Sequence, residues 1–194
     1  MKLPVYKNLK DGSKVELDYM HPSELEQVRT LLNAVIVEGK SYPQKEPLTL
    51  SEFKAYWQSS DTFVVKAVVP ILEFQPQGVL AAFYIKPNFP GRCSHICNAG
   101  FIVQPQMRSQ GIGRIMGETM LLIARSLGYK AVMFNLVFET NIPSIRLWES
   151  LGFEVIGKIP YGVELDNNQI IDALIMYRQL PLGEEGLNLQ TIEQ

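Results

Sequence analysis

A strand, an amphipathic helix and a second strand follow one another in the middle of the chain, and this unit constrains the fold more than any other feature. Residues 95–103 and 131–138 are apolar runs of strand length, and the second is nearly continuous, which is typical of a strand buried on both faces. Between them, apolar residues recur at helical spacing from Ile112 to Leu127, and Gly128 is placed to end that helix. A connecting helix of this length lets the two strands lie parallel. The sequence therefore predicts a layered domain around one mixed sheet, of the α/β or α+β class.

Helix starts are marked by capping residues elsewhere in the chain. Ser23 with Glu26, and Thr49 with Glu52, have the spacing of a capping box, so each pair predicts a helix behind it. Residues 141–151 read as a further helix that is closed by a glycine.

The remaining strands come in succession between turns that contain Pro or Gly. We expect them at residues 62–69, 79–85, 153–159 and 170–177, with residues 15–18 as the return arm of a small hairpin. A chain of 194 residues with 46% apolar residues is long enough to bury one core. We therefore expect one domain over residues 1–180 and a polar tail over residues 181–194.

Charge and hydropathy exclude several classes of partner. The net charge is −2 and the charges are dispersed, so no nucleic acid is expected to bind. The most apolar stretch, residues 63–72, is broken by Lys66 and Pro70 and is shorter than the ~18 residues of a membrane span, so no membrane association is expected. Two cysteines do not make a disulfide scaffold. A cytoplasmic protein is expected, and a mitochondrial pool stays open.

The loop between the first central strand and its helix has the features of a phosphate site. Gly111 and Gly113 let backbone N–H groups approach a ligand, and the helix N-terminus adds partial positive charge. Arg108 and Arg114 are expected to supply cations, so a pyrophosphate would fit there. The alternative is a tight turn with two solvated arginines.

A dinucleotide-binding site is a rival interpretation of the same glycines. Gly111, Gly113 and Gly117 resemble the Rossmann glycine pattern, and Glu139 ends the next strand where a ribose-binding acid belongs. However, seven residues separate Val103 from Gly111, and too little chain follows Glu139 for further units of that fold. A P-loop is excluded because no Gly-Lys-Ser/Thr closes the motif.

Two spaced motifs resemble the paired signatures of the GNAT superfamily of acetyl-CoA-dependent N-acetyltransferases. The first is Arg108-x-x-Gly111-x-Gly113, and the second is Asn141-x-x-Ser144-x-x-x-Trp148 followed by Gly152-Phe153. The resemblance covers about residues 15–177. It implies a mixed, mostly antiparallel sheet, splayed between its two central strands and flanked by helices, with acetyl-CoA as co-substrate in the splay and no metal. It also makes a homodimer plausible.

The same resemblance assigns the residues that hold acetyl-CoA. Backbone of the first central strand would pair with the pantetheine, the glycine loop would hold the pyrophosphate, and the last helix would face the cofactor arm. These residues are Phe101, Ile102, Val103, Arg108, Ser109, Gln110, Gly111, Ile112, Gly113, Arg114, Asn141, Ser144 and Trp148.

A closer likeness is to the fungal acetyltransferases that detoxify L-azetidine-2-carboxylate and related proline analogues. It is carried by residues 83–88, 97–100, 134–138, 140–141 and 157–160. It implies that the acceptor is a small cyclic amino acid with a secondary amine, and that Asn98 and Asn135 bind it. Alternatively, Asn98 is a turn or bulge residue and Asn135 satisfies backbone groups at the splay.

Acyl transfer to an amine needs an oxyanion donor, help for the leaving thiolate and an acceptor for the amine proton. The GNAT resemblance places the oxyanion donor on backbone near Phe101 or Ile102. Trp148 stands where the family commonly has an acidic tyrosine, and an indole has no useful acidity, so Asn141 or a water is expected to assist the thiolate. Asn135, Asn141 and Glu139 are thus the catalytic candidates, although Asn141 also suits a helix N-cap and Glu139 a solvated strand end.

The sequence also allows a metal site and two other functions to be considered. Cys93, His95 and Cys97 alternate along a predicted strand, but no fourth ligand accompanies them, so no metal is expected. The acceptor is alternatively a protein N-terminus or lysine, although no acidic run guides a basic peptide. A non-catalytic acetyl-CoA-binding module is the third interpretation, favoured by the missing tyrosine.

Overall fold

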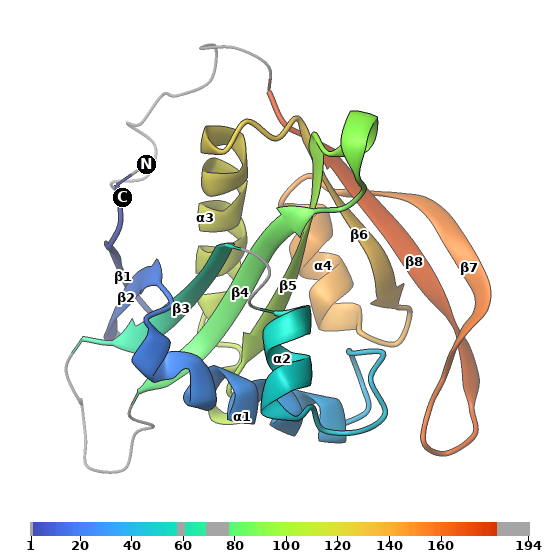
Figure 1. Ribbon diagram of the computed structural model, residues 1–194, viewed down its shortest axis with the longest axis horizontal. Coiled ribbons are helices and arrows are strands. Elements are labelled where there is room, and N and C mark those ends of the chain that lie inside the picture. The colour runs from blue at the N-terminus through green and yellow to red at the C-terminus, as the bar shows by residue number, and fades with distance from the viewer. Residues whose placement is uncertain (1, 58–60, 69–77, 182–194) are drawn as a thin grey trace.

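One mixed sheet forms the frame of the molecule. The computed structural model describes residues 2–57, 61–68 and 78–181, and within them eight strands lie in the order β1-β2-β3-β4-β5-β6-β8-β7 (Figure 1). The strands are β1 Val5–Asn8, β2 Lys14–Tyr19, β3 Asp61–Ala67, β4 Val79–Pro87, β5 Ile96–Val103, β6 Ala131–Phe138, β7 Glu154–Glu164 and β8 Ile170–Gln179. Every neighbouring pair is antiparallel except β5 and β6, which are parallel. The predicted fold class is confirmed.

Helices cover both faces of the sheet (Figure 1). They are α1 Leu25–Val37, α2 Leu50–Tyr56, α3 Ile112–Ser126 and α4 Ile142–Ser150. One core joins α3 and α4 to the sheet through residues such as Phe83, Met116 and Trp148. A second core joins α1 and α2 to the opposite face, with Trp57 and Tyr84 among its members. Burial on both faces explains why β4 and β6 read as nearly continuous apolar runs.

The two parallel strands separate soon after they begin. Paired positions in β5 and β6 are Ile96 with Ala131 and Cys97 with Val132, and no further pair follows along the two strands, all of whose residues are described. Further along, β6 also shifts register against β8 between Phe134 and Val137, which is a bulge. The splay that the GNAT resemblance implied is therefore present, and the bulge bends β6 at its rim.

Two local expectations need correction. The first helix does not use Ser23 and Glu26 as its capping box. A 3₁₀ turn over Pro22–Glu24 precedes it, in which the His21 backbone N–H donates to the Glu24 carboxylate at 2.6 Å and the His21 ring accepts from the Ser23 N–H. Glu26 pairs with Arg29 instead. The Thr49–Glu52 box is confirmed.

The C-terminal hairpin is longer than its apolar pattern predicts. β7 continues past Ile159 to Glu164, and a register shift between Ile159 and Val163 lets it stay paired with β8. Pro160 and Gly162, residue types that are rare inside strands, interrupt the apolar pattern in this part. Val69, at the end of the expected strand 62–69, and the expected tail from residue 182 onward lie outside the described residues.

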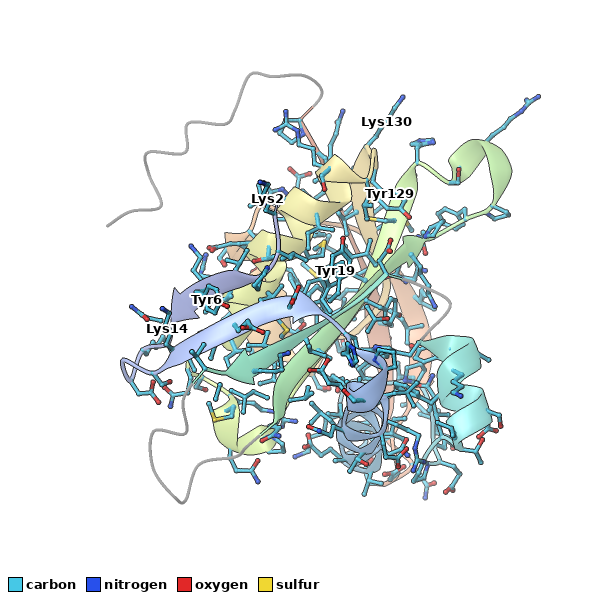
Figure 2. The ribbon with its side chains drawn as sticks, turned by 60° about the vertical axis from the view of Figure 1, so that its left-hand side comes forward. Lys2, Tyr6, Lys14, Tyr19, Tyr129 and Lys130 are labelled. Carbon is cyan, nitrogen blue, oxygen red and sulfur yellow. The ribbon has the colours of Figure 1, made fainter. Side chains whose placement is uncertain are left out.

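The N-terminal hairpin of β1 and β2 forms as predicted (Figure 2). Tyr6 and Lys14 lie on its outer face, where the Lys14 ammonium is 5.1 Å from the centre of the Tyr6 ring. The turn of this hairpin reaches the glycine loop, because the Lys10 N–H donates to the Gln110 carbonyl at 3.2 Å. The hairpin thus supports the loop that precedes α3.

Candidate active site

A cavity of about 390 Å³ opens where β5 and β6 part. Its walls come from β4, β5, β6, α4, the end of α2 and the segment between α1 and α2. The lining residues are Ser41, Tyr42, Pro43, Tyr56, Tyr84, Lys86, Pro87, Asn88, Asn98, Ala99, Gly100, Phe101, Phe134, Asn135, Leu136, Val137, Phe138, Asn141, Ser144 and Trp148.

The edge of β5 that faces the cavity has backbone groups without a strand partner. At the two ends of the β4–β5 ladder, the Gln104 N–H donates to the Leu80 carbonyl and the Asn88 N–H donates to the Ile96 carbonyl. In an antiparallel pair, the backbone N–H and C=O groups of successive residues point alternately toward and away from the partner strand. The even-numbered residues of β5 therefore hydrogen-bond to β4, whereas the backbone groups of Ala99, Phe101 and Val103 point into the splay.

Two of the three backbone positions expected to meet the cofactor are therefore available. The Phe101 carbonyl accepts the Tyr42 hydroxyl at 3.4 Å, which agrees with its orientation into the splay. Ile102 is placed otherwise: it faces Ala82 of β4, and its side chain is buried in the core under α1. Ala99, which sequence reasoning missed, takes its place.

The glycine loop holds the shape expected of an anion cradle. Gly111 has a φ of 95° as the N-cap of α3, a left-handed conformation that favours glycine. Gly113 lies under α4, where an added Cβ would come within 3.2 Å of Leu147. The Arg108 N–H donates to the Pro105 carbonyl and the Arg114 N–H to the Gly111 carbonyl, so residues 109 to 113 are the ones that present backbone N–H groups at this helix N-terminus, the arrangement that binds phosphates.

The two arginines of this loop are not free cations. Both guanidinium nitrogens of Arg108 donate to the Glu38 carboxylate, at 2.9 and 2.8 Å. Arg114 contacts Glu118 at 3.3 Å and the Ser150 hydroxyl at 2.8 Å. Each arginine thus already has a carboxylate partner, and the role expected of both in holding a pyrophosphate stays a prediction. Backbone N–H groups are what the loop offers.

Aromatic rings form the floor of the cavity. The Trp148 ring centre lies 4.7 Å from both Phe101 and Phe134, and Trp148 is buried. Gly117 of α3 makes room for it, since an added Cβ there would lie 3.0 Å from the indole. Trp148 therefore shapes the site through packing.

Two asparagine side chains, one after β4 and one on β6, pair near the point where β5 and β6 stop pairing. The Asn88 amide donates to Asn135 Oδ1 at 2.8 Å, and the Asn135 amide donates to Asn88 Oδ1 at 2.6 Å. Asn135 lies in the β6 bulge, where the pairing with β8 is interrupted. Its side-chain amide is hydrogen-bonded by the Asn88 side chain and not by backbone groups. Each amide keeps one N–H and one lone pair for a ligand. Sequence reasoning missed Asn88 as a site residue, although it ends the segment 83–88 that carried the closer likeness.

Comparison with known proteins decides the family. The model of the Acetyltransferase (GNAT) family matches residues 37–153. N-acetyltransferase aca1 of Schizosaccharomyces pombe is 40% identical over 167 residues, which cover 80% of this chain and 80% of that protein. The chain belongs to the GNAT family. The expectation of an acetyl-CoA-dependent N-acetyltransferase is confirmed at this level.

Solved structures agree with the GNAT fold. A GCN5-related N-acetyltransferase from Kribbella flavida has a TM-score of 0.77 at 26% identity and covers 86% of this chain and 98% of its own. A GNAT superfamily phosphinothricin acetyltransferase from Sinorhizobium meliloti, in complex with acetyl-CoA, has a TM-score of 0.75 at 17% identity, covering 91% and 97%.

Asn98 and Gly100 of this GNAT domain line the cavity from β5. Asn98 is paired with Lys86 across the β4–β5 ladder, and Gly100 with Tyr84. An added Cβ on Gly100 would come within 2.5 Å of the Tyr84 ring and 2.9 Å of the Tyr42 hydroxyl. Glycine at this position is what allows both tyrosines to lie against β5.

Three tyrosines in the cavity wall were not predicted. A tyrosine hydroxyl is neutral at pH 7, and burial raises the pKa of Tyr84 and of Tyr42 further above the usual value. Tyr56 lies edge-on to Tyr84, with ring centres 6.1 Å apart. These residues are far apart in sequence and share no motif, so only the fold could bring them together.

Of the catalytic candidates on the rim, Asn141 lines the cavity and Glu139 does not. The Asn141 side chain accepts the Ser144 N–H at 3.4 Å, so it caps α4 while facing the site. Glu139 accepts the Asp172 N–H at 3.0 Å and lies 3.4 Å from the Lys158 ammonium. This carboxylate therefore organises β7 and β8, and its position gives no support to the expected role as proton acceptor.

Cys93 lies in the exposed 3₁₀ turn Gly91–Cys93 and not on β5, where Cys97 is buried, so the expected alternation along one strand does not occur. Within residues 2–57, 61–68 and 78–181, no group of three or more His, Cys, Asp or Glu is placed to hold a metal ion. Among the same residues, no helix is both long and apolar enough to span a membrane.

Proposed function

We propose that this GNAT enzyme transfers the acetyl group of acetyl-CoA directly to the ring nitrogen of a small proline-like amino acid such as L-azetidine-2-carboxylate. One observation supports it most. Five segments resemble the azetidine-carboxylate acetyltransferases, and three of them lie on separate strands, β4, β5 and β6, yet line one cavity. Asn141 of a fourth segment also lines it, whereas the fifth segment, residues 157–160 on β7, does not. A likeness concentrated in the wall of a pocket points to a shared acceptor.

The open edge of β5 and the glycine loop fit acetyl-CoA at this site. Peptide groups of Val103, Phe101 and Ala99 are aligned for an extended amide-bearing chain, and residues 108–114 suit a pyrophosphate at the N-terminus of α3. The thioester end would then reach the floor formed by Phe101, Phe134 and Trp148.

Orientation of the acceptor nitrogen and stabilisation of the oxyanion have matching groups in the cavity, and the first proton goes to water. The acceptor ammonium first loses one proton to water, since none of the described lining residues is a carboxylate. Asn135 orients the neutral nitrogen, whose lone pair forms the new C–N bond at the acetyl carbonyl. A backbone N–H of Phe101 or Ala99 donates to the developing oxyanion.

Formation of the C–N bond gives a tetrahedral intermediate, and its collapse breaks the C–S bond. The thiolate leaves with the electron pair and takes up the proton released by the nitrogen, giving an N-acetyl amino acid and free coenzyme A. A thiol has a pKa near about 8.5, so hydrogen bonding from Asn141 or water is sufficient in place of an acidic tyrosine.

Release of free thiol from acetyl-CoA tests the proposal. The acceptors are azetidine-2-carboxylate, proline analogues, primary amino acids, a lysine peptide and a peptide with a free N-terminus. We expect the highest kcat/KM with a cyclic amino acid. Acetylation of a peptide without activity on any cyclic amino acid assigns a protein acetyltransferase. Acetyl-CoA binding without turnover of any acceptor supports a non-catalytic module.

A further inference from the structure

Lys86 is the single formal charge among the described residues that line the cavity. The other lining residues are apolar, hydroxyl-bearing or amide-bearing, and the tyrosine hydroxyls among them are neutral at pH 7. A cavity with one cation and no carboxylate in its described wall is matched to an anionic ligand group. It is poorly matched to a polyamine or a lysine side chain, whose positive charge would meet Lys86 and find no counterion.

We propose that the Lys86 ammonium binds the carboxylate of the acceptor, so that the enzyme requires an amine that carries a free carboxylate. This inference rests on the proposed function and adds to it the residue that selects the substrate. It goes beyond Asn98 and Asn135, which are neutral and cannot by themselves distinguish a carboxylate from an amide.

The ammonium is held in place by two rings. Lys86 Nζ lies 4.7 Å from the centre of the Tyr84 ring and 4.9 Å from that of Tyr56, and it donates to the Tyr56 carbonyl at 3.5 Å. Such cation–π contacts fix the position of a charge without neutralising it. In the described part of the chain, none of the ion pairs includes Lys86.

The Lys86 ammonium is partly buried, so water solvates it less than it would an exposed lysine. Desolvation lowers the pKa of Lys86 from its usual value, as expected for a cation withdrawn from water without a counterion. An arriving carboxylate would relieve that penalty, and a charge-assisted hydrogen bond of this kind is stronger than one between neutral groups.

The strand geometry places the carboxylate site beside the amide pair. Side chains alternate along β4, so Tyr84, Lys86 and the following Asn88 point to the same face. Residues two apart in a strand are separated by about 6.6 Å, a span that one small amino acid can bridge with its carboxylate toward Lys86 and its nitrogen toward Asn88 and Asn135. Asn98, paired with Lys86 across the ladder, can donate to the same carboxylate.

The test compares azetidine-2-carboxylate with azetidine-2-carboxamide, which keeps the ring nitrogen and lacks the charge. Wild-type enzyme should prefer the acid by about 10- to 100-fold in kcat/KM. In Lys86→Met, kcat/KM for the acid should fall by that factor, and kcat/KM for the amide should stay close to the wild-type value. Lys86→Arg, which keeps the charge, should retain most of the preference, and the surface variant Lys54→Met is the matched control for loss of a charge from a neighbouring helix.

A binding measurement separates this inference from the proposed function. Calorimetry of the acid and the amide on coenzyme A-loaded protein reports the Lys86 contact without turnover, and coenzyme A affinity reports that each variant is folded. Equal binding of acid and amide by wild type, or equal losses on both in Lys86→Met, overturns the role of Lys86. Selective acid binding without acetylation would keep it and reject the proposed reaction instead.

Discussion

Asn135 is the residue whose identity matters most for the chemistry we propose. Its amide is paired with Asn88, and neither residue brings a charge to the nitrogen of the acceptor. A neutral group suits this place because a carboxylate would hold the ammonium in its protonated, non-nucleophilic form. The apolar surroundings of Asn135 made it visible in the sequence, whereas its partner Asn88 was not, because the pairing spans 47 residues.

Asn135→Asp should therefore lower kcat/KM for the cyclic amino acid by about 100-fold at pH 7. The new carboxylate raises the pKa of the bound ammonium, so the pH at which activity reaches half its maximum should move upward. Acetyl-CoA affinity should not change. Steady-state kinetics from pH 6 to 10 measure both effects, and an unshifted profile with full activity would return Asn135 to a structural role.

Gly100→Ala tests the contact between β5 and the tyrosines. The added methyl would meet Tyr84 at 2.5 Å and Tyr42 at 2.9 Å, so we expect a loss of about 1–3 kcal/mol in the free energy of unfolding and a higher KM for the acceptor. Gly157→Ala in β7 is the matched control, because its nearest neighbour would be 3.5 Å away. Similar stability of the two variants in urea would contradict the packing described here.

The two cysteines should differ in reactivity. Burial raises the pKa of the Cys97 thiol to about 12, while Cys93 is exposed. At pH 8 a disulfide reagent should modify one thiol quickly in the folded protein and two after unfolding.

The same buried thiol should make stability depend on pH. Because an unfolded thiol ionises near about 8.5, Cys97 should lower the free energy of unfolding as pH rises from about 9 toward 12, and should have no such effect at lower pH. Rapid modification of both thiols in folded protein would exclude a buried Cys97.

At the scale of elements, the strand–helix–strand unit was predictable and its opening was not. Length and periodicity predicted residues 95–103, 112–127 and 131–138 within one or two residues of β5, α3 and β6. Where two parallel strands stop pairing depends on the bulge in β6 and on what α4 inserts between them, and neither leaves a periodic signal. Only the resemblance to the GNAT family predicted the splay, and the structure shows which backbone groups of β5 it leaves without a strand partner.

The glycine loop gives the prediction that belongs to this scale. Gly111→Val should raise the dissociation constant of acetyl-CoA at least tenfold, about 1.4 kcal/mol, because a β-branched side chain obstructs the backbone N–H groups and resists a φ of 95°. Gly128→Val is the control, since Gly128 has a φ of 87°, open space around it and a place at the other end of α3. If the two variants bind acetyl-CoA equally well, the loop is a structural turn.

At the scale of the whole molecule, two halves of the sheet meet at the site. The half with β1 to β5, α1 and α2 contributes Lys86 and Asn88 to the cavity wall, and the half with β6 to β8 and α4 contributes Asn135 and Trp148. The order of elements could be predicted because each carries its own local pattern. The convergence of Tyr42, Tyr56 and Tyr84 on one cavity could not, because it depends on how two layers pack across the sheet.

A crystal structure with coenzyme A and azetidine-2-carboxylate tests the central claim most directly. We expect the pyrophosphate over residues 108–114, the thiol between Phe101 and Trp148, and the amino acid with its nitrogen at Asn135 and its carboxylate at Lys86. Coenzyme A bound away from the opening between β5 and β6, or an amino acid outside the cavity, would contradict the account.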